Sequence, residues 1–221
     1  MRKWLSAILI ITGLALILSP LFTEKMVEQQ IERTNKYIES ITAEEIELNR
    51  QMKAEYDYSA IADVSAITAA VAVSQFEDPN IVGLLKIPEL GIDLPILNGV
   101  SDANLMAGAG TMVPDLVMGE GNFSLASHYM KDPKLLFGNL LNAQPEMSVK
   151  ITDKRNIYEY RIYETVLVPE TALYMLDQER ADLRGKPIIS LMTCYYTSKN
   201  GKRFFALGEL VDTYEYSEDK F

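Results

Sequence analysis

Cysteine and histidine are almost absent from this chain, which has one of each among 221 residues, Cys194 and His128. A lone cysteine excludes a disulfide within the chain, and one cysteine with one histidine cannot make a zinc ligand set. Basic residues are also scarce, since 21 Lys and Arg stand against 31 Asp and Glu, a net charge of −10. That balance argues against a nucleic-acid partner and against broad docking on anionic lipid, because both need a basic face.

A long apolar run lies near the N-terminus, at residues 4–22, directly after the basic pair Arg2 and Lys3. The run has no charged residue and is long enough to cross a bilayer as a helix. Basic residues favour the cytoplasmic side, so we expect a cell-membrane protein with a cytoplasmic N-terminus at residues 1–3, a single-pass transmembrane signal anchor at 4–22, and an extracellular remainder. A cleaved signal peptide is the alternative, although the only nearby cleavage site, around residues 19–21, is poor.

The region that follows, residues 23–79, is predicted to be an extracellular helical stalk or linker. Its apolar residues recur at alternating steps of four and three, which predicts an amphipathic helix with a narrow seam. A second helix is predicted at residues 60–75, and the turn residues 77–80 mark a domain boundary. Two interpretations of this helix remain. It is either a stalk that spaces the domain from the membrane or pairs with a second stalk, or a solvated linker helix. The seam comprises Val27, Ile31, Thr34, Ile38 and Ile41.

Residues 80–221 are predicted to form a mostly β domain with short helices. The expected strands are short apolar or alternating segments bounded by Gly, Pro and Asn. Short helices are expected at residues 102–107 and 134–141, with a helical turn inside 169–185. Seven or eight short strands with few helices are typical of a closed or nearly closed β-barrel. The expected strands are residues 81–87, 91–97, 122–127, 148–152, 157–168, 187–193 and 203–211.

The last two expected strands place the lone cysteine beside an arginine. Cys194 follows the apolar strand 187–193, and Arg203 begins the next strand after a turn-bearing loop. If these strands pair as neighbours, the thiol and the guanidinium lie side by side at one sheet edge. His128 also falls at a strand end, and the strand ends of a small barrel collect at two rims, where functional sites form.

These three side chains have the chemistry of acyl transfer. A thiol becomes a good nucleophile once it is ionised, and a nearby imidazole or guanidinium favours the thiolate. Histidine can return a proton to a leaving amine, and arginine can hold an oxyanion, with the backbone N–H of Tyr195 as a second donor. The alternative for Cys194 is a buried structural cysteine that behaves as a small hydrophobe.

The segments around these residues resemble the sortases, the membrane-anchored cysteine transpeptidases of Gram-positive bacteria. Residues 190–194 (SLMTC) are similar to the TLxTC signature of that family, with Ser190 in place of the usual threonine, and Arg203 follows at the family's spacing. Residues 124–128 (SLASH) resemble the family's histidine segment. Further class A-like segments lie at residues 87–96 and 108–112, within a resemblance that covers residues 82–211.

The resemblance implies an eight-stranded sortase-type β-barrel and a transpeptidase that requires no cofactor. It implies that Cys194 attacks the Thr–Gly carbonyl of an LPxTG-like sorting signal and forms a thioester. His128 would protonate the departing glycine amine, and Arg203 would steady the signal and the oxyanion. An amine of the lipid-linked peptidoglycan precursor would then resolve the thioester, so the pocket should shield the thioester from water.

The family resemblance also implies an apolar groove for the Leu-Pro part of the sorting signal. The connection that ends near Gly185 helps to form that groove in the family. Any of the candidate residues can equally be part of the core. The candidates for lining the groove or contacting the substrate are Ala126, Ser127, Val168, Pro169, Leu173, Leu183, Thr193 and Tyr195.

Calcium and subclass are the two remaining questions. Some class A sortases bind calcium through carboxylates, but the spacing here departs from that pattern and we expect no required metal. Pilus-type sortases usually have a lid before the barrel and often a C-terminal membrane helix. Residues 212–219 are polar, which favours the class A housekeeping type. The carboxylates considered for calcium are Asp115, Glu120, Glu170 and Glu179.

Two functions from other classes remain as alternatives. One is a catalytically inactive, membrane-tethered β-barrel that only binds peptides or partners. The other is a cysteine L,D-transpeptidase, but in that family the histidine and the cysteine lie close together in sequence. Here His128 and Cys194 lie far apart in the chain. The sequence therefore favours the sortase interpretation.

Overall fold

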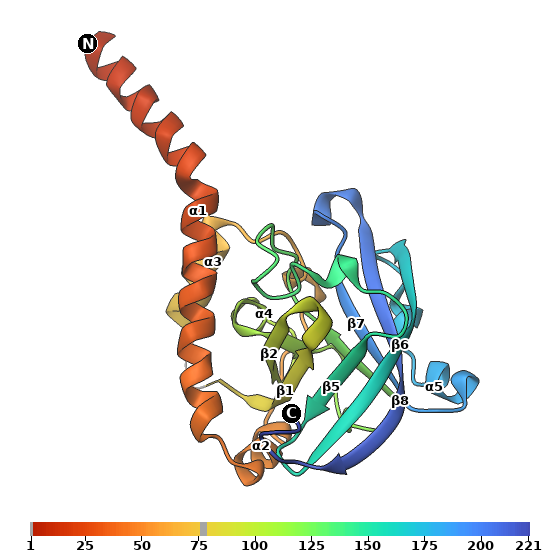
Figure 1. Ribbon diagram of the computed structural model, residues 1–221. Coiled ribbons are helices and arrows are strands. Elements are labelled where there is room, and N and C mark those ends of the chain that lie inside the picture. Colours follow the sequence, from red (N-terminus) through yellow and green to blue (C-terminus); the bar gives the residue numbers. More distant parts are fainter. Residues whose placement is uncertain (1, 76–78) are drawn as a thin grey trace.

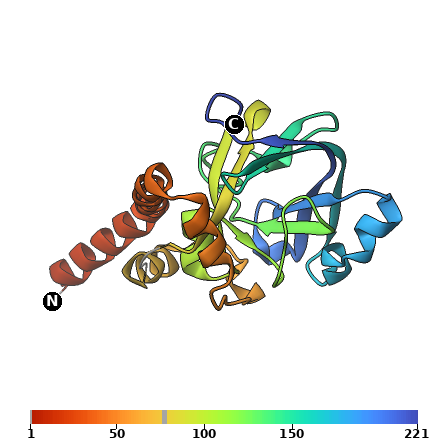
Figure 2. The same ribbon diagram turned by 90° about the horizontal axis from the view of Figure 1, so that it is seen from below.

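The computed structural model describes residues 2–75 and 79–221, and its strands close into a barrel (Figures 1 and 2). Around the barrel the strands follow the order β1-β2-β3-β4-β7-β8-β6-β5. The predicted mostly β, eight-stranded barrel is therefore confirmed. The strands are β1 (Ile81–Ile87), β2 (Ile92–Leu97), β3 (Ala109–Thr111), β4 (Asn122–Ala126), β5 (Ser148–Thr152), β6 (Asn156–Pro169), β7 (Ile188–Cys194) and β8 (Lys202–Glu215).

Helices precede the barrel or lie in its connections. The expected helix at residues 102–107 is present, whereas the expected helix at 134–141 is wrong. That segment forms turns, because Leu136 has a positive φ of 49° that a helix does not allow. The helix predicted at residues 60–75 begins only at Ala66. The helices are α1 (Arg2–Ser40), α2 (Ala43–Arg50), α3 (Ala66–Gln75), α4 (Asp102–Ala107) and α5 (Glu179–Arg184), with short 3-10 turns that include η1 (Tyr58–Ala60), η3 (Leu140–Asn142), η4 (Leu173–Leu176) and η5 (Ser198–Asn200).

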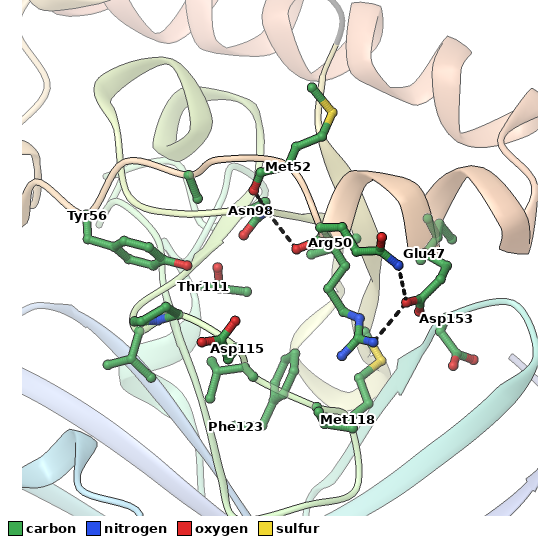
Figure 3. Close-up of a pocket in the computed structure, with 18 of the residues that line it drawn as sticks. Glu47, Arg50, Met52, Tyr56, Asn98, Thr111, Asp115, Met118, Phe123 and Asp153 are labelled. Carbon is green, nitrogen blue, oxygen red and sulfur yellow. Dashed lines mark hydrogen bonds and ion pairs between the residues drawn. The ribbon is translucent and has the colours of Figure 1, made fainter.

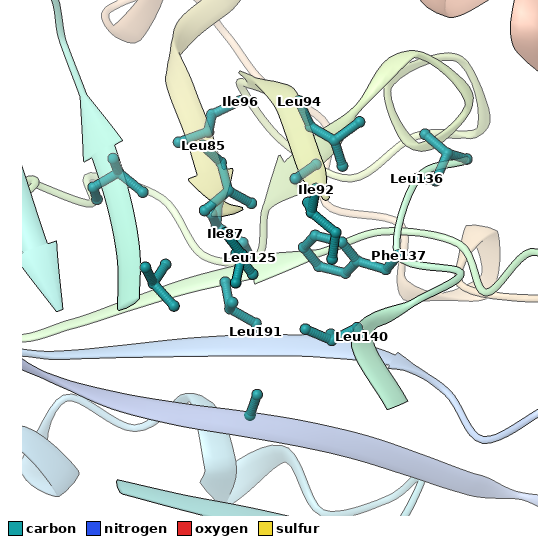
Figure 4. Packing of buried hydrophobic residues seen from close by; sticks show 14 of the residues in the cluster. Leu85, Ile87, Ile92, Leu94, Ile96, Leu125, Leu136, Phe137, Leu140 and Leu191 are labelled. Atoms are coloured by element: carbon teal, nitrogen blue, oxygen red, sulfur yellow. The ribbon is translucent and has the colours of Figure 1, made fainter. Parts of the chain in front are cut away.

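Branched apolar side chains from the strands fill the barrel (Figure 4). Leu85, Ile96, Leu125 and Leu191 are all fully buried, and they come from four different strands. The ring of Phe137, from the connection between β4 and β5, is also fully buried in this cluster. The turns at residues 134–141 thus supply core side chains, which explains why their apolar pattern imitated a helix.

Two strand pairings bring the ends of β4 and β7 and the start of β8 to the same rim of the barrel. Strands β4 and β7 run parallel, with Ala126 opposite Met192, so their C-terminal ends emerge at the same rim. Strands β7 and β8 are antiparallel neighbours, so β8 begins where β7 ends. The segments after β4 and β7 and the first residues of β8 are therefore brought together.

Asn122 at the start of β4 fastens the connection between β6 and β7 to the barrel. Its buried Nδ2 donates to the carbonyls of Met175 (3.0 Å) and Asp177 (3.2 Å), and its Oδ1 accepts from Ser190 Oγ (2.7 Å). We expect Asn122→Ala to lower the free energy of unfolding by about 2–4 kcal/mol, because these buried groups lose their partner. Denaturant unfolding measures the change, with the exposed Asn142→Ala as the control. A loss below about 1 kcal/mol would contradict the assignment.

The second half of α1 packs along the side of the barrel, against α3 and α4 (Figure 1). Val27, on the predicted apolar seam, is fully buried there. Lys154, in the turn between β5 and β6, donates to the carbonyls of Ile38 and Ile41 at 2.8 Å each, at the end of α1 where a cation is favourable. The second half of α1 and the helix α2 therefore lie against the barrel in this structure.

The apolar run at residues 4–22 forms the first part of α1, and the large apolar side chains that the structure describes there are exposed, as at Trp4 (77%). Within the described residues, no single helix has both the length and the hydropathy of a membrane span. Trp4–Leu14 and Ile17–Ser40, which meet at a bend of 41°, could do so as a pair by length and composition. The predicted single-pass anchor is thus not confirmed. Residue 1 and part of the predicted boundary turn at 77–80 lie outside the described residues.

Candidate active site

The lone cysteine ends β7, and the arginine lies opposite it on β8. Cys194 and Arg203 are direct partners in the β7–β8 ladder, as the sequence predicted. The loop between the strands contains η5 and turns at Gly201, whose φ is +64°. The Asn200 side chain donates to the Tyr195 carbonyl at 2.6 Å, which closes the loop onto its own start. The antiparallel ladder therefore holds the thiol and the guanidinium at the same rim.

His128 follows β4 on the other side of the cysteine strand. The parallel register continues past the end of β4, since the Ser127 N–H donates to the Met192 carbonyl at 3.2 Å. The Thr193 hydroxyl then donates to the Ser127 carbonyl at 2.9 Å. These bonds bring the segment that contains His128 next to the end of β7. The imidazole is 3% exposed, and its Nδ1 has no hydrogen-bond partner among the described residues.

A segment from before the barrel covers these three residues. We call residues 55–65 the strap. The carbonyl oxygen of Ile61 accepts from Arg203 Nη2 at 3.1 Å and lies 3.8 Å from the Cys194 sulfur. The backbone of the next strap residue, Ala62, interacts with His128 and raises the pKa of its imidazole. Successive strap residues thus contact all three predicted catalytic side chains, which brings these side chains to one place.

The strap is fastened at both ends. Near its start, backbone hydrogen bonds join Glu55 and Asp57 to Val100. At its end, the Asp63 carboxylate accepts from the Thr197 hydroxyl and from the Ser198 N–H, both at 2.6 Å. These partners lie in the loop that follows Cys194, so the strap is tied to the catalytic loop itself.

Burial under the strap makes both the thiol and the imidazole electrically neutral at neutral pH. Burial lowers the pKa of His128 to about 4, and the Ala62 backbone and Asp63 oppose that shift only in part. Burial also raises the pKa of Cys194; Arg203 lowers it, whereas Asp63 and Glu170 add to the rise. The covered site therefore holds a protonated thiol, which is a poor nucleophile.

The residues suggested for substrate contact divide into two groups. Ala126, Ser127 and Thr193 are fully buried, and the Ser127 hydroxyl donates to the Gly108 carbonyl at 2.7 Å. These residues build the wall behind the site and are not accessible in this covered state. Tyr195 is half-buried, and its ring meets that of Tyr196 edge-on at 4.6 Å.

The other group lies beside Arg203, around a small apolar hollow. Val168 packs in the same cluster as Cys194 and Ile61, and Pro169 lines a hollow of about 20 Å³ together with Arg203. Leu183, by contrast, is 88% exposed on α5 and lies outside this cluster. The apolar groove expected from the family resemblance is nearly closed here. The residues around the hollow also include Leu173, Leu176, Met192 and Phe205.

The carboxylates considered for calcium do not form a metal site in this structure. Among residues 2–75 and 79–221, no group of three or more His, Cys, Asp or Glu side chains could hold a metal ion. Glu170 instead forms an ion pair with Arg203, with Oε2 and Nη2 3.1 Å apart. Arg203 is thus shared between the strap carbonyl and this carboxylate.

Two larger hollows lie outside the immediate site. One, of about 360 Å³, lies between α2, the start of the strap and the β3–β4 connection (Figure 3). That connection leads into β4 at the end remote from His128. The other hollow, of about 450 Å³, is here called the α1-side cleft. Residues of α1 between Ser19 and Glu24 form one wall, and residues 63–66, 129–131 and 196–197 form the rest.

Sequence reasoning missed the strap, because its second half, residues 60–65, falls within the helix predicted at residues 60–75. One local signal was available. The Ser65 hydroxyl accepts from the Thr68 N–H at 3.1 Å, and the Thr68 hydroxyl accepts from the Ser65 N–H at 2.9 Å. Serine before an Ala-rich run is a helix-start signal, and it would have moved the helix start to Ala66. No local pattern predicts that the preceding residues cross the site.

Comparison with known proteins gives the family. The family model of the sortase domain matches residues 85–211. Sortase A of Listeria monocytogenes is 32% identical over 219 residues, which cover 99% of this chain and 96% of that protein. Sortase A of Streptococcus agalactiae is 32% identical, covering 97% of this chain and 87% of that protein.

Solved structures agree on the fold. The Listeria monocytogenes sortase A structure superposes with a TM-score of 0.58 at 35% identity, covering 63% of this chain and 92% of that chain. Sortase C-3 of Streptococcus pneumoniae gives a TM-score of 0.62 at 19% identity, covering 86% of this chain and 95% of that chain. At 19% identity, the similarity to sortase C-3 shows only that the two proteins share a fold. The sequence matches over most of both chains place this protein in the sortase family of cysteine transpeptidases.

Proposed function

We propose that this chain is a class A sortase that cleaves LPxTG-type sorting signals between Thr and Gly, with Cys194 as the nucleophile. The observation that carries the proposal is the contact of one backbone carbonyl, that of Ile61, with both Cys194 and Arg203. A substrate carbonyl in the same place would lie within reach of the sulfur and of an oxyanion donor. Relatives called sortase A, 32% identical over nearly the whole chain, support the class A assignment.

The first half of the reaction follows from these positions. The thiolate of Cys194 attacks the threonine carbonyl carbon, and Arg203 stabilises the oxyanion that forms. The C–N bond to glycine then breaks, and His128 delivers to the departing amine the proton taken from the thiol. The product is a thioester on Cys194 and a free glycine-terminated peptide.

The second half returns the enzyme to its starting state. An amine attacks the thioester carbonyl, the C–S bond breaks, and the proton lost by the amine returns through His128 to the Cys194 sulfur. The groove for the signal would be the apolar region beside Arg203, where Val168 and Pro169 lie. Ala126, Ser127 and Thr193 would hold that region's wall in place, and Tyr195 would offer its backbone N–H to the oxyanion.

The cellular setting is part of the proposal. Residues 1–3 would lie in the cytoplasm, residues 4–22 would anchor the chain in the membrane, residues 23–79 would form a helical linker, and residues 80–221 the catalytic barrel outside the cell. The exposed apolar side chains at the start of α1 support this arrangement. The acceptor would be an amine of the lipid-linked peptidoglycan precursor, so both substrates would meet at the membrane surface.

Incubation of the full chain with an LPxTG peptide and hydroxylamine tests the proposed function. We expect a peptide hydroxamate from the unmutated chain and a loss of about a thousandfold or more in Cys194→Ala, because the acyl carrier is gone. Thermal unfolding of both chains controls for misfolding. If the unmutated chain yields no hydroxamate and no thioester, a peptide-binding barrel without catalysis becomes the better description.

A further inference from the structure

The α1-side cleft begins where both catalytic loops leave the barrel. Its walls contain residues 129–131, directly after His128, and residues 196–197, which follow Cys194 after one intervening residue. It shares no lining residue with the apolar hollow beside Arg203. The cleft is thus lined by the segments that follow His128 and Cys194, whereas the hollow is lined by Arg203 itself.

The lining of this cleft combines charged and aromatic side chains with small polar and apolar ones. Glu24 and Lys131 both line it, and neither forms an ion pair with any residue that the structure describes. The rings of Tyr129 and Tyr196 meet edge-on at 5.7 Å and form an aromatic wall. Unpaired charges of both signs beside tyrosine rings suit a peptide-like ligand that carries an amine and an anionic group.

The wall that α1 contributes indicates the direction from which such a ligand enters the cleft. Ser19 and Pro20 belong to the end of the apolar run at residues 4–22, and Glu24 follows shortly after that run. Figure 1 shows α1 leaving the barrel at the end where the β7–β8 loop lies. If residues 4–22 enter a membrane, the cleft opens at the membrane surface, beside the segments that follow His128 and Cys194.

We propose that the α1-side cleft binds the incoming acceptor, an amine-bearing peptide held at the membrane by a lipid. This inference rests on the proposed transpeptidase function and adds the place of the second substrate. The acceptor amine attacks the same carbonyl from which the glycine amine left, so by microscopic reversibility it approaches along the path of departure. With the acyl part of the signal beside Arg203, that path lies on the side of His128, and the cleft is there. Glu24 and Asp63 attract the ammonium form before it loses its proton.

Acceptor kinetics on the full chain in phospholipid vesicles test this assignment. Hydroxylamine is small and needs no cleft, so LPxTG cleavage at saturating hydroxylamine reports acylation alone. Triglycine in solution, and triglycine coupled to a phospholipid headgroup, then serve as acceptors from water and from the membrane. We expect Glu24→Lys and Tyr196→Ala to raise the KM for both triglycine forms about fivefold, with cleavage in hydroxylamine unchanged. Glu32→Lys, a charge reversal at a more exposed position of α1 away from the cleft, is the control.

The outcomes separate this assignment from the proposed function. Normal cleavage with an unchanged KM for triglycine in both variants would overturn the cleft while leaving the transpeptidase intact. If Glu32→Lys raises the KM for triglycine by the same factor, the effect comes from the overall charge of the protein, and the assignment of the cleft as the acceptor site is overturned as well. Use of soluble triglycine with no use of the membrane-held form would overturn the membrane origin. Absence of any hydroxamate from the unmutated chain would remove the function on which the cleft depends.

Discussion

Replacing Arg203 with lysine is expected to lower kcat/KM for an LPxTG peptide by about a hundredfold or more, although the positive charge is kept. Arg203 Nη2 lies 3.1 Å from the Ile61 carbonyl oxygen and 3.1 Å from Glu170 Oε2. A planar guanidinium has several N–H groups in fixed directions and can donate to a carbonyl and a carboxylate at the same time. The ammonium of lysine, on a flexible side chain, cannot hold both hydrogen bonds in that geometry. A hundredfold loss corresponds to about 2.7 kcal/mol of transition-state stabilisation.

Two control variants separate an oxyanion role from a structural one. Glu170→Gln removes the ion pair with Arg203 but leaves the guanidinium, so we expect a rate that is unchanged or higher. Lys202→Ala removes the preceding exposed cation and should change the rate less than twofold. If Glu170→Gln reproduces the loss seen in Arg203→Lys, Arg203 serves mainly to fix the loop that contains Glu170. A lysine variant with normal kcat/KM would exclude a role for the guanidinium fork.

Much of the barrel was predictable because its strands carry their signals locally. The segments at residues 81–87 and 148–152 were predicted with their observed bounds, since Pro and Asn or charged turns delimit short apolar runs. Strand β3 (Ala109–Thr111) was missed because it is too short to show an alternation and is buried on both faces. The turns at residues 134–141 imitate a helix because their apolar side chains point into the core from irregular backbone.

The catalytic candidates were predictable for a different reason, which is rarity. The chain has one cysteine and one histidine, so a site that needs both residue types must contain Cys194 and His128. The β7–β8 ladder then placed Arg203 opposite Cys194. The position of the strap could not be predicted in this way, because Asp63 accepts hydrogen bonds from Thr197 and Ser198, which lie far away in the sequence. Contacts of that kind depend on the complete fold, and no local periodicity reports them.

Releasing the strap is expected to expose the thiol. In Asp63→Ala, two short hydrogen bonds from the catalytic loop to the carboxylate are lost. Because Asp63 is exposed, we assign these bonds about 1–2 kcal/mol together, which increases the open population about five- to thirtyfold. The rate of Cys194 alkylation by iodoacetamide should rise by the same factor. Asp57→Ala, which removes only local interactions with Ser59, is the matched control and should change the rate less than twofold.

The pH dependence of alkylation gives this prediction a second, independent readout. Burial raises the pKa of Cys194, and the negative charge of Asp63 adds to that rise. Alkylation of the unmutated chain should therefore increase only as the pH passes above the ordinary thiol range. In Asp63→Ala the same curve should move to lower pH, because both the cover and the charge are reduced.

Global unfolding would also expose Cys194, so the melting temperature must be measured alongside the alkylation rate. A variant that reacts faster at an unchanged melting temperature has opened locally, which is the outcome expected for a strap that covers a folded barrel. Faster turnover of LPxTG peptide in the same variant would show that the closed strap competes with substrate for the contacts of Cys194 and Arg203. Equal alkylation rates for Asp63→Ala and the unmutated chain, with no shift of the pH curve, would mean that the Ile61 carbonyl does not restrict access to the sulfur.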